Sequence, residues 1–474
     1  MVFSSVEFLV FFLPALIVCY FCTPKKFTKC RNLILLLFSL GFYSYGGVKF
    51  LGLLFVSIAI NYVAALWVNP ERSIKVRKTA VALATVGNLA LLFYFKYTGF
   101  FAEVLNGMGC NLPVPEIILP IGISFYTFQG LSYVVDVYRE QAVVQKNPLW
   151  VALYIAFFPQ LVAGPIVRYV TVAEEIEERH ESVDEFYQGL VRFLFGFSKK
   201  MLLANSMGEV ADAIFALHAG NMATSLAWVG AVAYTFQIYF DFSAYSDMAI
   251  GLGRMFGFHF EENFRYPYIS RSITEFWRRW HISLSTWFRD YVYIPLGGNR
   301  KGSGRHIRNI IVVWFLTGMW HGASWNFILW GLWFCILLLG EKYFWGKWME
   351  KLPSLCRHIY TMLLVIISWV LFRCETLLQV VDYISVLFAV KGTGLADQQT
   401  IYYLLQYRWE FIFAFFASLP LKEIPKRFLQ KKPDCAVRKT LVFGGAPVLA
   451  MMLFMLSYIR LAAGSFNPFI YFRF

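Results

Sequence analysis

The chain has 474 residues, of which 58% are hydrophobic, 19% aromatic and only 15% charged. Soluble domains carry about 25% charged residues, so this composition excludes an ordinary soluble enzyme and an intrinsically disordered chain. Several uncharged stretches reach the roughly 20 residues that an α-helix needs to cross a bilayer. We therefore expect one integral-membrane domain over residues 1–474. Its predicted fold class is an all-α polytopic bundle, with about 11 transmembrane helices plus interfacial or re-entrant helices.

Hydrophobic runs near residues 6–22, 50–68 and 80–97 predict spanning helices in the first part of the chain. Clusters of lysine and arginine follow two of these runs, over residues 25–31 and 72–78. Short loops with such clusters lie in the cytoplasm, so we expect the N-terminus outside. The distribution of the 43 basic and 29 acidic residues matters more than the excess itself, and the basic residues cluster in short loops such as these. It indicates contact with membrane lipid and gives no reason to expect a nucleic-acid partner.

An acidic segment interrupts this pattern between Ala173 and Glu185, where seven residues are aspartate or glutamate. Insertion of so many charges into lipid is unfavourable. We expect this segment to form a solvated loop or a surface helix.

The cysteine and histidine spacings give no support for a metal site. The eight cysteines are scattered, and Cys19 and Cys22 are the only pair at CxxC spacing, with no second pair or nearby histidine. The seven histidines show no HExxH or similar spacing. We expect no bound metal.

Residues 241–326 differ from the rest of the chain because polar and charged side chains interrupt otherwise apolar segments. Between Arg254 and Arg308, ten residues are basic and four are acidic, which indicates a cytoplasmic working face. Asp241 and Asp247 precede this stretch. They either contribute to substrate binding by orienting a histidine or a water, or satisfy buried hydrogen-bond donors.

The residues from Trp277 to Phe288 have the periodicity of an amphipathic helix. At about 100° per residue, five side chains fall on one stripe. They are Trp277, Trp280, His281, Leu284 and Phe288. The arginines Arg278, Arg279 and Arg289 occupy another side, where they meet water, lipid headgroups or an anionic ligand. His281 then points into the protein or the bilayer, either as a functional group or as a hydrogen-bonded histidine of a surface helix.

His321 lies in a 32-residue segment, 309–340, that contains no Asp, Glu, Lys or Arg. Because this segment is longer than one crossing, two structures are possible. It is either a tilted or broken helix with His321 near its midpoint, or a hairpin with His321 at the turn. Gly318 and Gly322 flank the histidine and leave room for another chain or a substrate. Trp325 is expected one turn away from His321, on the same helical face.

An ionisable side chain at this depth is a functional hypothesis, since hydrocarbon offers imidazole no partner. Burial disfavours the charged form, so we expect His321 to be neutral near pH 7. A neutral imidazole can take the proton of a hydroxyl that attacks an activated acyl group and return it to the leaving group. No GxSxG motif accompanies it, which favours direct transfer over a covalent acyl-enzyme. The alternative is a structural histidine that bonds to a neighbouring helix.

Several long motifs run through almost the whole chain. They are 1–5 (MVFSS), 119–129 (LPIGISFYTFQ), 158–165 (FPQLVAGP), 241–251 (DFSAYSDMAIG), 276–299 (FWRRWHISLSTWFRDYVYIPLGGN) and 318–322 (GMWHG). In these motifs the sequence resembles the membrane-bound O-acyltransferase (MBOAT) superfamily, and within it the bacterial alginate O-acetyltransferase-like branch. Their combined length is far more specific than a lone short motif.

The resemblance implies that His321 is the catalytic histidine and that His281 is a second polar active-site residue. It implies an MBOAT-type bundle around a central tunnel, which joins a cytoplasmic acyl-donor site to an outward-facing acceptor site. It also implies a multi-pass protein of the bacterial inner (plasma) membrane. Members of this branch commonly work with a separate extracytoplasmic acetyltransferase-like or esterase-like protein, so we expect a glycan or such a protein as partner.

The expected function is transfer of an acetyl group toward hydroxyls of an exported or cell-envelope polysaccharide. The expected donor is acetyl-CoA at the cytoplasmic face, with no permanently bound cofactor. Arg278, Arg279 and Arg289 are candidates for binding its phosphates, and Trp320 and Trp325 for lining the tunnel. Two alternatives remain: D-alanyl transfer from a carrier protein to teichoic acid, and a transporter without transferase activity that uses buried histidines as a proton relay.

Overall fold

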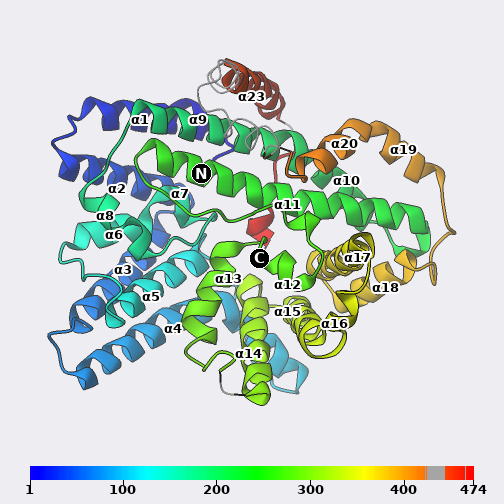
Figure 1. Cartoon of the computed structure of the whole chain (residues 1–474), viewed down its shortest axis with the longest axis horizontal. Coiled ribbons are helices and arrows are strands. Elements are labelled where there is room, and N and C mark those ends of the chain that lie inside the picture. Colours follow the sequence, from blue (N-terminus) through cyan, green and yellow to red (C-terminus); the bar gives the residue numbers. More distant parts are fainter. Residues whose placement is uncertain (301, 422, 424–443, 465, 474) are drawn as a thin grey trace. The chain divides into compact units, whose positions relative to one another are not determined.

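The computed structural model describes residues 1–300, 302–421, 423, 444–464 and 466–473, and the regular elements in these ranges are all helices (Figure 1). This confirms the predicted all-α class. The chain forms two compact units. Unit 1 comprises Met1–Phe193 and Ser246–Glu262, and unit 2 comprises Leu194–Tyr245 and Asn263–Phe474. Compactness does not decide whether a unit folds independently, so the single domain over residues 1–474 stays a prediction.

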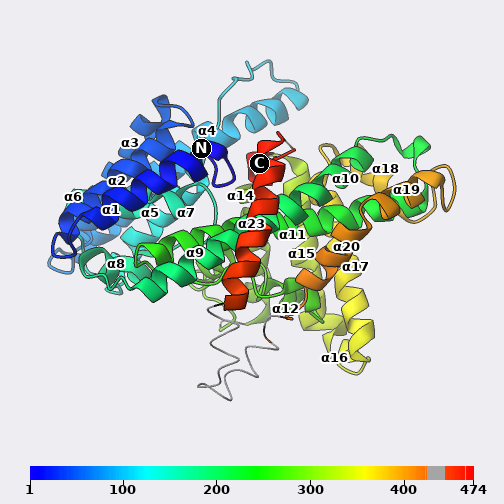
Figure 2. The same ribbon diagram turned by 90° about the horizontal axis from the view of Figure 1, so that it is seen from above.

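Unit 1 contains the helices drawn in blue to blue-green in Figures 1 and 2. They are η1 (Phe8–Phe12, a π-helix), α1 (Leu13–Cys22), α2 (Thr28–Ser44), α3 (Lys49–Trp67), α4 (Ile74–Gly107), α5 (Ile123–Tyr138), α6 (Pro148–Ala156), α7 (Phe158–Leu161) and α8 (Tyr169–Glu177). Two further helices, α9 (Val183–Ser198) and α11 (Thr224–Met255), contribute residues to both units.

Polar side chains hold the apolar helices of unit 1 together. Asn61 of α3 and Asn88 of α4 are completely buried and exchange side-chain amide hydrogen bonds of 3.1 and 3.0 Å. Gly130 of α5 lies so close that an added Cβ would be 2.2 Å from the Asn61 amide nitrogen. Small residues and amide pairs are typical of helix contacts in membranes, where apolar surface alone gives little driving force.

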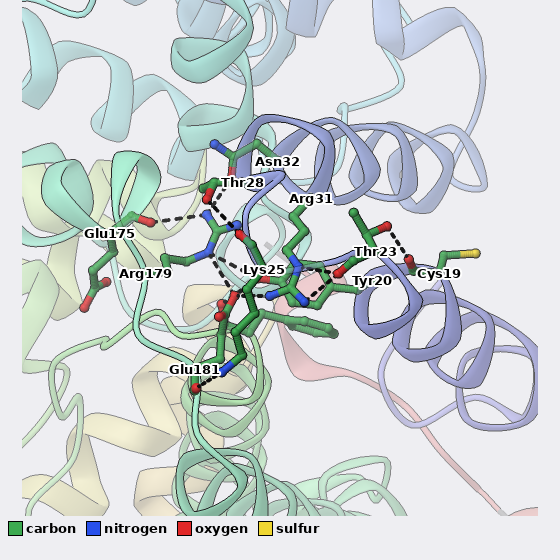
Figure 3. A network of polar contacts seen from close by, with 11 residues as sticks. Cys19, Tyr20, Thr23, Lys25, Thr28, Arg31, Asn32, Glu175, Arg179 and Glu181 are labelled. Atoms are coloured by element: carbon green, nitrogen blue, oxygen red, sulfur yellow. Dashed lines mark hydrogen bonds and ion pairs between the residues drawn. The ribbon is translucent and has the colours of Figure 1, made fainter.

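The acidic segment of unit 1 is only partly solvated, which corrects the sequence prediction. The Glu181 side chain is 8% exposed and forms an ion pair of 2.9 Å with Arg31 of α2. It also accepts a 2.6 Å hydrogen bond from the Tyr20 hydroxyl of α1, and Arg179 donates to the same hydroxyl (Figure 3). Periodicity did not reveal this pairing because the partners are about 150 positions away in the sequence. Glu174, Glu177 and Asp184 are exposed, as expected.

Unit 2 contains the remaining helices. They are η2 (Lys199–Ala204), α10 (Asn205–Phe215), η3 (Ala219–Asn221), η4 (Pro267–Ile269), α12 (Ile273–Trp277), α13 (Ile282–Phe288), η5 (Arg289–Tyr293), α14 (Ser303–His321), α15 (Trp325–Gly340), η6 (Glu341–Trp345), α16 (Gly346–Met349), α17 (Ser354–Arg373), α18 (Leu377–Leu387), α19 (Gln398–Gln406), α20 (Arg408–Ala417), α23 (Ala446–Ala462) and η8 (Ile470–Arg473). Among these, η2, η5 and η6 are π-helical. Lys301, one of the basic residues counted between Arg254 and Arg308, lies outside the described residues.

The uncharged segment 309–340 is a hairpin of α14 and α15, so the second of the two sequence interpretations is correct. The helices pack through glycines. A Cβ on Gly318 would lie 2.4 Å from the carbonyl oxygen of Phe327, and one on Gly331 would lie 2.3 Å from that of Trp314. The space beside Gly318 is therefore filled by the protein's own second helix. Helix α17 lies beside α15 (Figure 2).

In the described part of the chain, four helical segments are long and apolar enough to cross a membrane. They are Lys49–Trp67, Ile74–Gly107, Trp325–Met349 and Ser354–Arg373. The first two coincide with the hydrophobic runs predicted at 50–68 and 80–97. Shorter apolar helices occur at Phe8–Cys22, Leu377–Leu387 and Ala446–Ala462. The count of about 11 transmembrane helices and the central tunnel stay predictions.

Candidate active site

His281 lies at a break between two short helices, and not within one continuous helix as the periodicity predicted. Helix α12 ends at Trp277 and α13 begins at Ile282. His281 is the residue before α13, with φ 45° and ψ 53°. This left-handed conformation is unfavourable for a residue with a Cβ, and it persists only where neighbouring contacts impose it.

Hydrogen bonds from residues 263–265 hold the chain on both sides of His281. The Asn263 carbonyl accepts from the Ile282 N–H at 2.9 Å, and its side-chain oxygen accepts from the N–H and hydroxyl of Ser283 at 3.2 and 2.9 Å. Before the histidine, the Arg265 N–H donates to the Arg279 carbonyl at 2.9 Å. The sequence analysis missed Asn263, because an asparagine outside a helix carries no periodic signal.

The apolar stripe predicted around His281 is buried even though the helix is broken. The exposed fractions of the five side chains are 8% or less (Trp277, Trp280, His281, Leu284 and Phe288). The break therefore changes the backbone path and leaves the same side chains facing the interior. In this segment, hydrophobic periodicity indicated the buried residues correctly but did not indicate the break in the helix.

His321 is the last residue of α14 and is 8% exposed. Three aromatic rings pack edge-on against its imidazole. The ring centroids of Trp320 and Trp330 lie 4.9 Å from that of His321, and the centroid of Phe372 lies 5.2 Å away. Trp330 belongs to α15 and Phe372 to α17, and the sequence analysis named neither of them. Both lie in apolar helices, where an aromatic residue is no sign of a functional site.

The structure brings both predicted histidines to one indole ring. Trp320 is 3% exposed, and its ring centroid lies 5.9 Å from that of His281 and 4.9 Å from that of His321. The interplanar angles are 79° and 83°, so both contacts are edge-to-face. His281 also packs against Phe242 and Phe264, at 6.5 and 6.1 Å. All these residues belong to unit 2.

Burial determines the protonation state of His281, which lies outside the four segments that qualify as membrane spans. Desolvation lowers its pKa from 6.5 to about 3. Its Nδ1 is buried, and no other residue in the described ranges forms a side-chain hydrogen bond with the imidazole. His281 is therefore neutral near pH 7, with a ring orientation set by packing.

The three candidate donor-binding arginines differ in their partners. Arg279 forms an ion pair of 2.8 Å with Glu275, one turn earlier. Arg289 forms one of 2.7 Å with the adjacent Asp290. Arg278 is exposed and forms no ion pair with the described residues. Of the three, Arg278 therefore presents its guanidinium to solvent without a carboxylate beside it. A phosphate that binds there would not have to displace a carboxylate.

The remaining candidates lie in three separate environments. Trp325 is the first residue of α15 and is 52% exposed, so the prediction that it shares the helical face of His321 is wrong. The hairpin turn between the two residues is the reason. Asp241 is buried in unit 2 and pairs with Lys200. Asp247 belongs to unit 1, where Arg192 forms an ion pair of 2.8 Å with it.

Comparison with known proteins identifies the family to which the chain belongs. Residues 48–380 match the membrane-bound O-acyltransferase (MBOAT) family. The chain belongs to this family. It is 40% identical over 505 aligned residues to "Probable alginate O-acetylase AlgI" of Azotobacter vinelandii, and the alignment covers 100% of both chains.

Two further relatives of this MBOAT protein carry other names. The peptidoglycan O-acetyltransferase of Helicobacter pylori is 34% identical over 432 residues, which cover 83% of this chain and 81% of the relative. The teichoic acid D-alanyltransferase of Bacillus subtilis is 30% identical over 279 residues, which cover 55% of this chain and 68% of the relative.

Family membership makes this MBOAT protein a multi-pass membrane enzyme, an O-acyltransferase. It removes the reason for the transporter alternative, in which the buried histidines served a proton relay. The region matched to the family includes His281, Trp320 and His321. The resemblance found in the sequence motifs is therefore confirmed over the segment that contains both histidines.

Proposed function

We propose that the protein transfers acetyl groups from cytoplasmic acetyl-CoA toward hydroxyls of an exported or cell-envelope polysaccharide, with His321 as general base. The observation that carries the proposal is the position of His321, a buried imidazole at a helix end, beside a second buried imidazole on the same indole. The proposed location is the bacterial inner membrane. An acetyltransferase-like protein on the outer side is the proposed partner that receives or delivers the acetyl group.

In the proposed reaction, the acceptor oxygen attacks the carbonyl carbon of the thioester. Neutral His321 takes the hydroxyl proton as the C–O bond forms, and the C–S bond then breaks. The imidazolium returns the proton to the departing CoA thiolate, so that the histidine is neutral again. The aromatic rings around His321 exclude water, which limits hydrolysis of the thioester.

The choice of acetyl over D-alanyl transfer rests on the comparisons. Full-length similarity at 40% identity is to a protein named as an alginate O-acetylase, whereas similarity to a teichoic acid D-alanyltransferase covers 55% of this chain. Mass spectrometry of the esters on envelope glycans distinguishes the two groups. Esters that carry alanine in cells expressing the protein would support the D-alanyl alternative.

The test of the base uses two buried histidines of the same helix. His321→Gln keeps much of the side-chain volume but removes the base, and acyl transfer should fall by about 100-fold to 10,000-fold. The control is His306→Gln, since His306 is 6% exposed at the other end of α14 and contacts Lys342 and Tyr343. The control should keep most of its activity. Normal ester formation by His321→Gln, at normal protein levels in the membrane, would refute the proposed base.

The donor assignment has a separate test. Arg278→Ala should raise the KM for acetyl-CoA, because a phosphate contact is lost, and should leave kcat unchanged. Arg289→Ala serves as the matched control, because the guanidinium of Arg289 already pairs with Asp290. Equal KM values for the two variants would remove Arg278 from the donor site.

A further inference from the structure

A buried ion pair lies in unit 2, outside the group of residues around the two histidines. Lys200 of η2 and Asp241 of α11 are 2.6 Å apart, and their side chains are 4% and 2% exposed. Burial of two charges is unfavourable unless further hydrogen bonds satisfy the groups. Here the Ile470 N–H donates to the second carboxylate oxygen at 2.8 Å, and the Lys200 ammonium donates to the Pro468 carbonyl.

Residues 467–470, here called the strap, are fixed by further contacts. Phe469 stacks on Tyr245 of α11, with ring centroids 4.9 Å apart and an angle of 24°. The Asn205 amide donates to the Asn467 side-chain oxygen at 3.2 Å. Phe469 and Ile470 are 8% and 2% exposed. The strap, red in Figure 1, is thus an integral part of the packing against α11.

The turn of α11 held by the strap also contacts the candidate active site. Phe242 follows Asp241 directly, and its ring packs on His281 at 6.5 Å. Ser243 follows Phe242 in the sequence, and its hydroxyl accepts a 3.2 Å hydrogen bond from Lys199. Both lysines come from η2, a π-helical segment, and such segments occur frequently at functional sites.

We propose that Lys200, Asp241 and the strap together position His281 for acyl transfer, and that Phe242 transmits the constraint. The inference rests on the proposed function. No hydrogen bond from another described residue orients the His281 imidazole, so its aromatic neighbours fix the ring. Among these aromatic residues, Phe242 is the one whose two neighbours in the sequence, Asp241 and Ser243, both contact lysines of η2.

The proposal separates positioning from donor binding. Loss of the constraint lets the His281 ring rotate without altering the arginines, so kcat falls while the KM for acetyl-CoA stays constant. A misplacement of about 1 Å near reacting groups lowers rates by about 100-fold. A merely structural role would lower the amount of folded enzyme and leave the kcat of the folded fraction unchanged.

The experiment measures kcat, KM and thermal stability of the purified full chain in detergent micelles, per folded molecule. Phe242→Leu removes the ring but leaves the ion pair and the strap intact, and its kcat should fall at least about tenfold. Phe242→Tyr keeps the ring and should restore most of the rate. Ile470→Pro removes the N–H that Asp241 accepts, and Ile470→Val keeps it. We expect a lower kcat for Ile470→Pro and near-normal kinetics for Ile470→Val.

A wild-type kcat for Phe242→Leu would overturn the proposal, and so would equal kinetics for the two Ile470 variants. If Ile470→Pro does not fold, Phe242→Leu and Phe242→Tyr decide alone. Failure of the proposed function has a different signature, since His321→Gln would then retain activity whatever the Phe242 variants show. An inactive His321→Gln together with normal Phe242→Leu would refute only the positioning role.

Discussion

A single methyl group added at Gly318, where α14 contacts α15, has an effect that can be predicted quantitatively. An added Cβ on Gly318 would be 2.4 Å from the Phe327 carbonyl oxygen, about 1 Å less than the 3.4 Å at which ordinary van der Waals contact begins. Neither backbone can yield locally, so Gly318→Ala must push the two helices apart by about 1 Å. Overpacking of this kind costs about 1–3 kcal/mol.

The rate of acyl transfer should fall by a larger factor than the loss of stability alone would cause. His321 lies three residues after Gly318, and Trp330, which packs on it, lies on the displaced helix. A shift of about 1 Å between catalytic groups lowers rates by about 100-fold. We therefore expect a lower melting temperature in detergent, and a loss of acyl transfer that remains when the assay is run well below that temperature.

Gly304→Ala is the matched control on the same helix. An added Cβ at Gly304 meets no atom within 4 Å. Alanine is favoured over glycine in helices by about 0.5–1 kcal/mol, so this variant should be as stable as the wild type or slightly more stable. Equal shifts in melting temperature for the two variants, or full activity of Gly318→Ala, would refute the reasoning.

Three further predictions concern other parts of the protein. The folded state resists protonation of His281 until about pH 3, whereas the unfolded chain protonates near 6.5. Stability should therefore decrease as pH falls through this window, by up to about 1.4 kcal/mol per pH unit, and pH-dependent denaturation of His281→Asn should lack this component. Arg192→Lys should lower stability by about 2 kcal/mol in thermal denaturation, because one ammonium cannot replace the fork that binds Asp247 and Glu262. Its kcat should be normal, and a reduced kcat would instead support Asp247 as a substrate-binding residue. Asn263→Ala leaves the donors of Ser283 without their acceptor and should lower both stability, by about 1–3 kcal/mol, and kcat. An unchanged kcat would show that the Asn263 hydrogen bonds beside His281 are not needed for activity.

Much of this fold could be predicted because apolar content is a local property of the sequence. The runs at 50–68 and 80–97 became α3 and α4, and the uncharged segment 309–340 became a hairpin of two helices. The stripe around His281 is buried as predicted. In each case, side chains within one short window carry the signal.

Several features that the sequence did not reveal depend on partners that lie outside the local window of residues. The helix breaks at His281 because residues 263–265 hold the flanking backbone, and nothing within the window 277–288 indicates this. Glu181 is buried because Arg31 lies beside it. Asp241 pairs with Lys200 and also accepts a hydrogen bond from the Ile470 N–H, which lies 229 positions away in the sequence.

The alternation of the two units along the chain has a consequence for biosynthesis. Unit 1 is interrupted after Phe193 and is completed only by Ser246–Glu262, so its last part leaves the ribosome 69 residues later. At about 5–20 residues per second, this delay lasts about 3–14 s. During that interval the nascent chain already contains the first portion of the other unit. A fragment ending at residue 193 would therefore lack part of its own core. A set of fragments that begin at Met1 and end within the chain should contain no stable half of the enzyme.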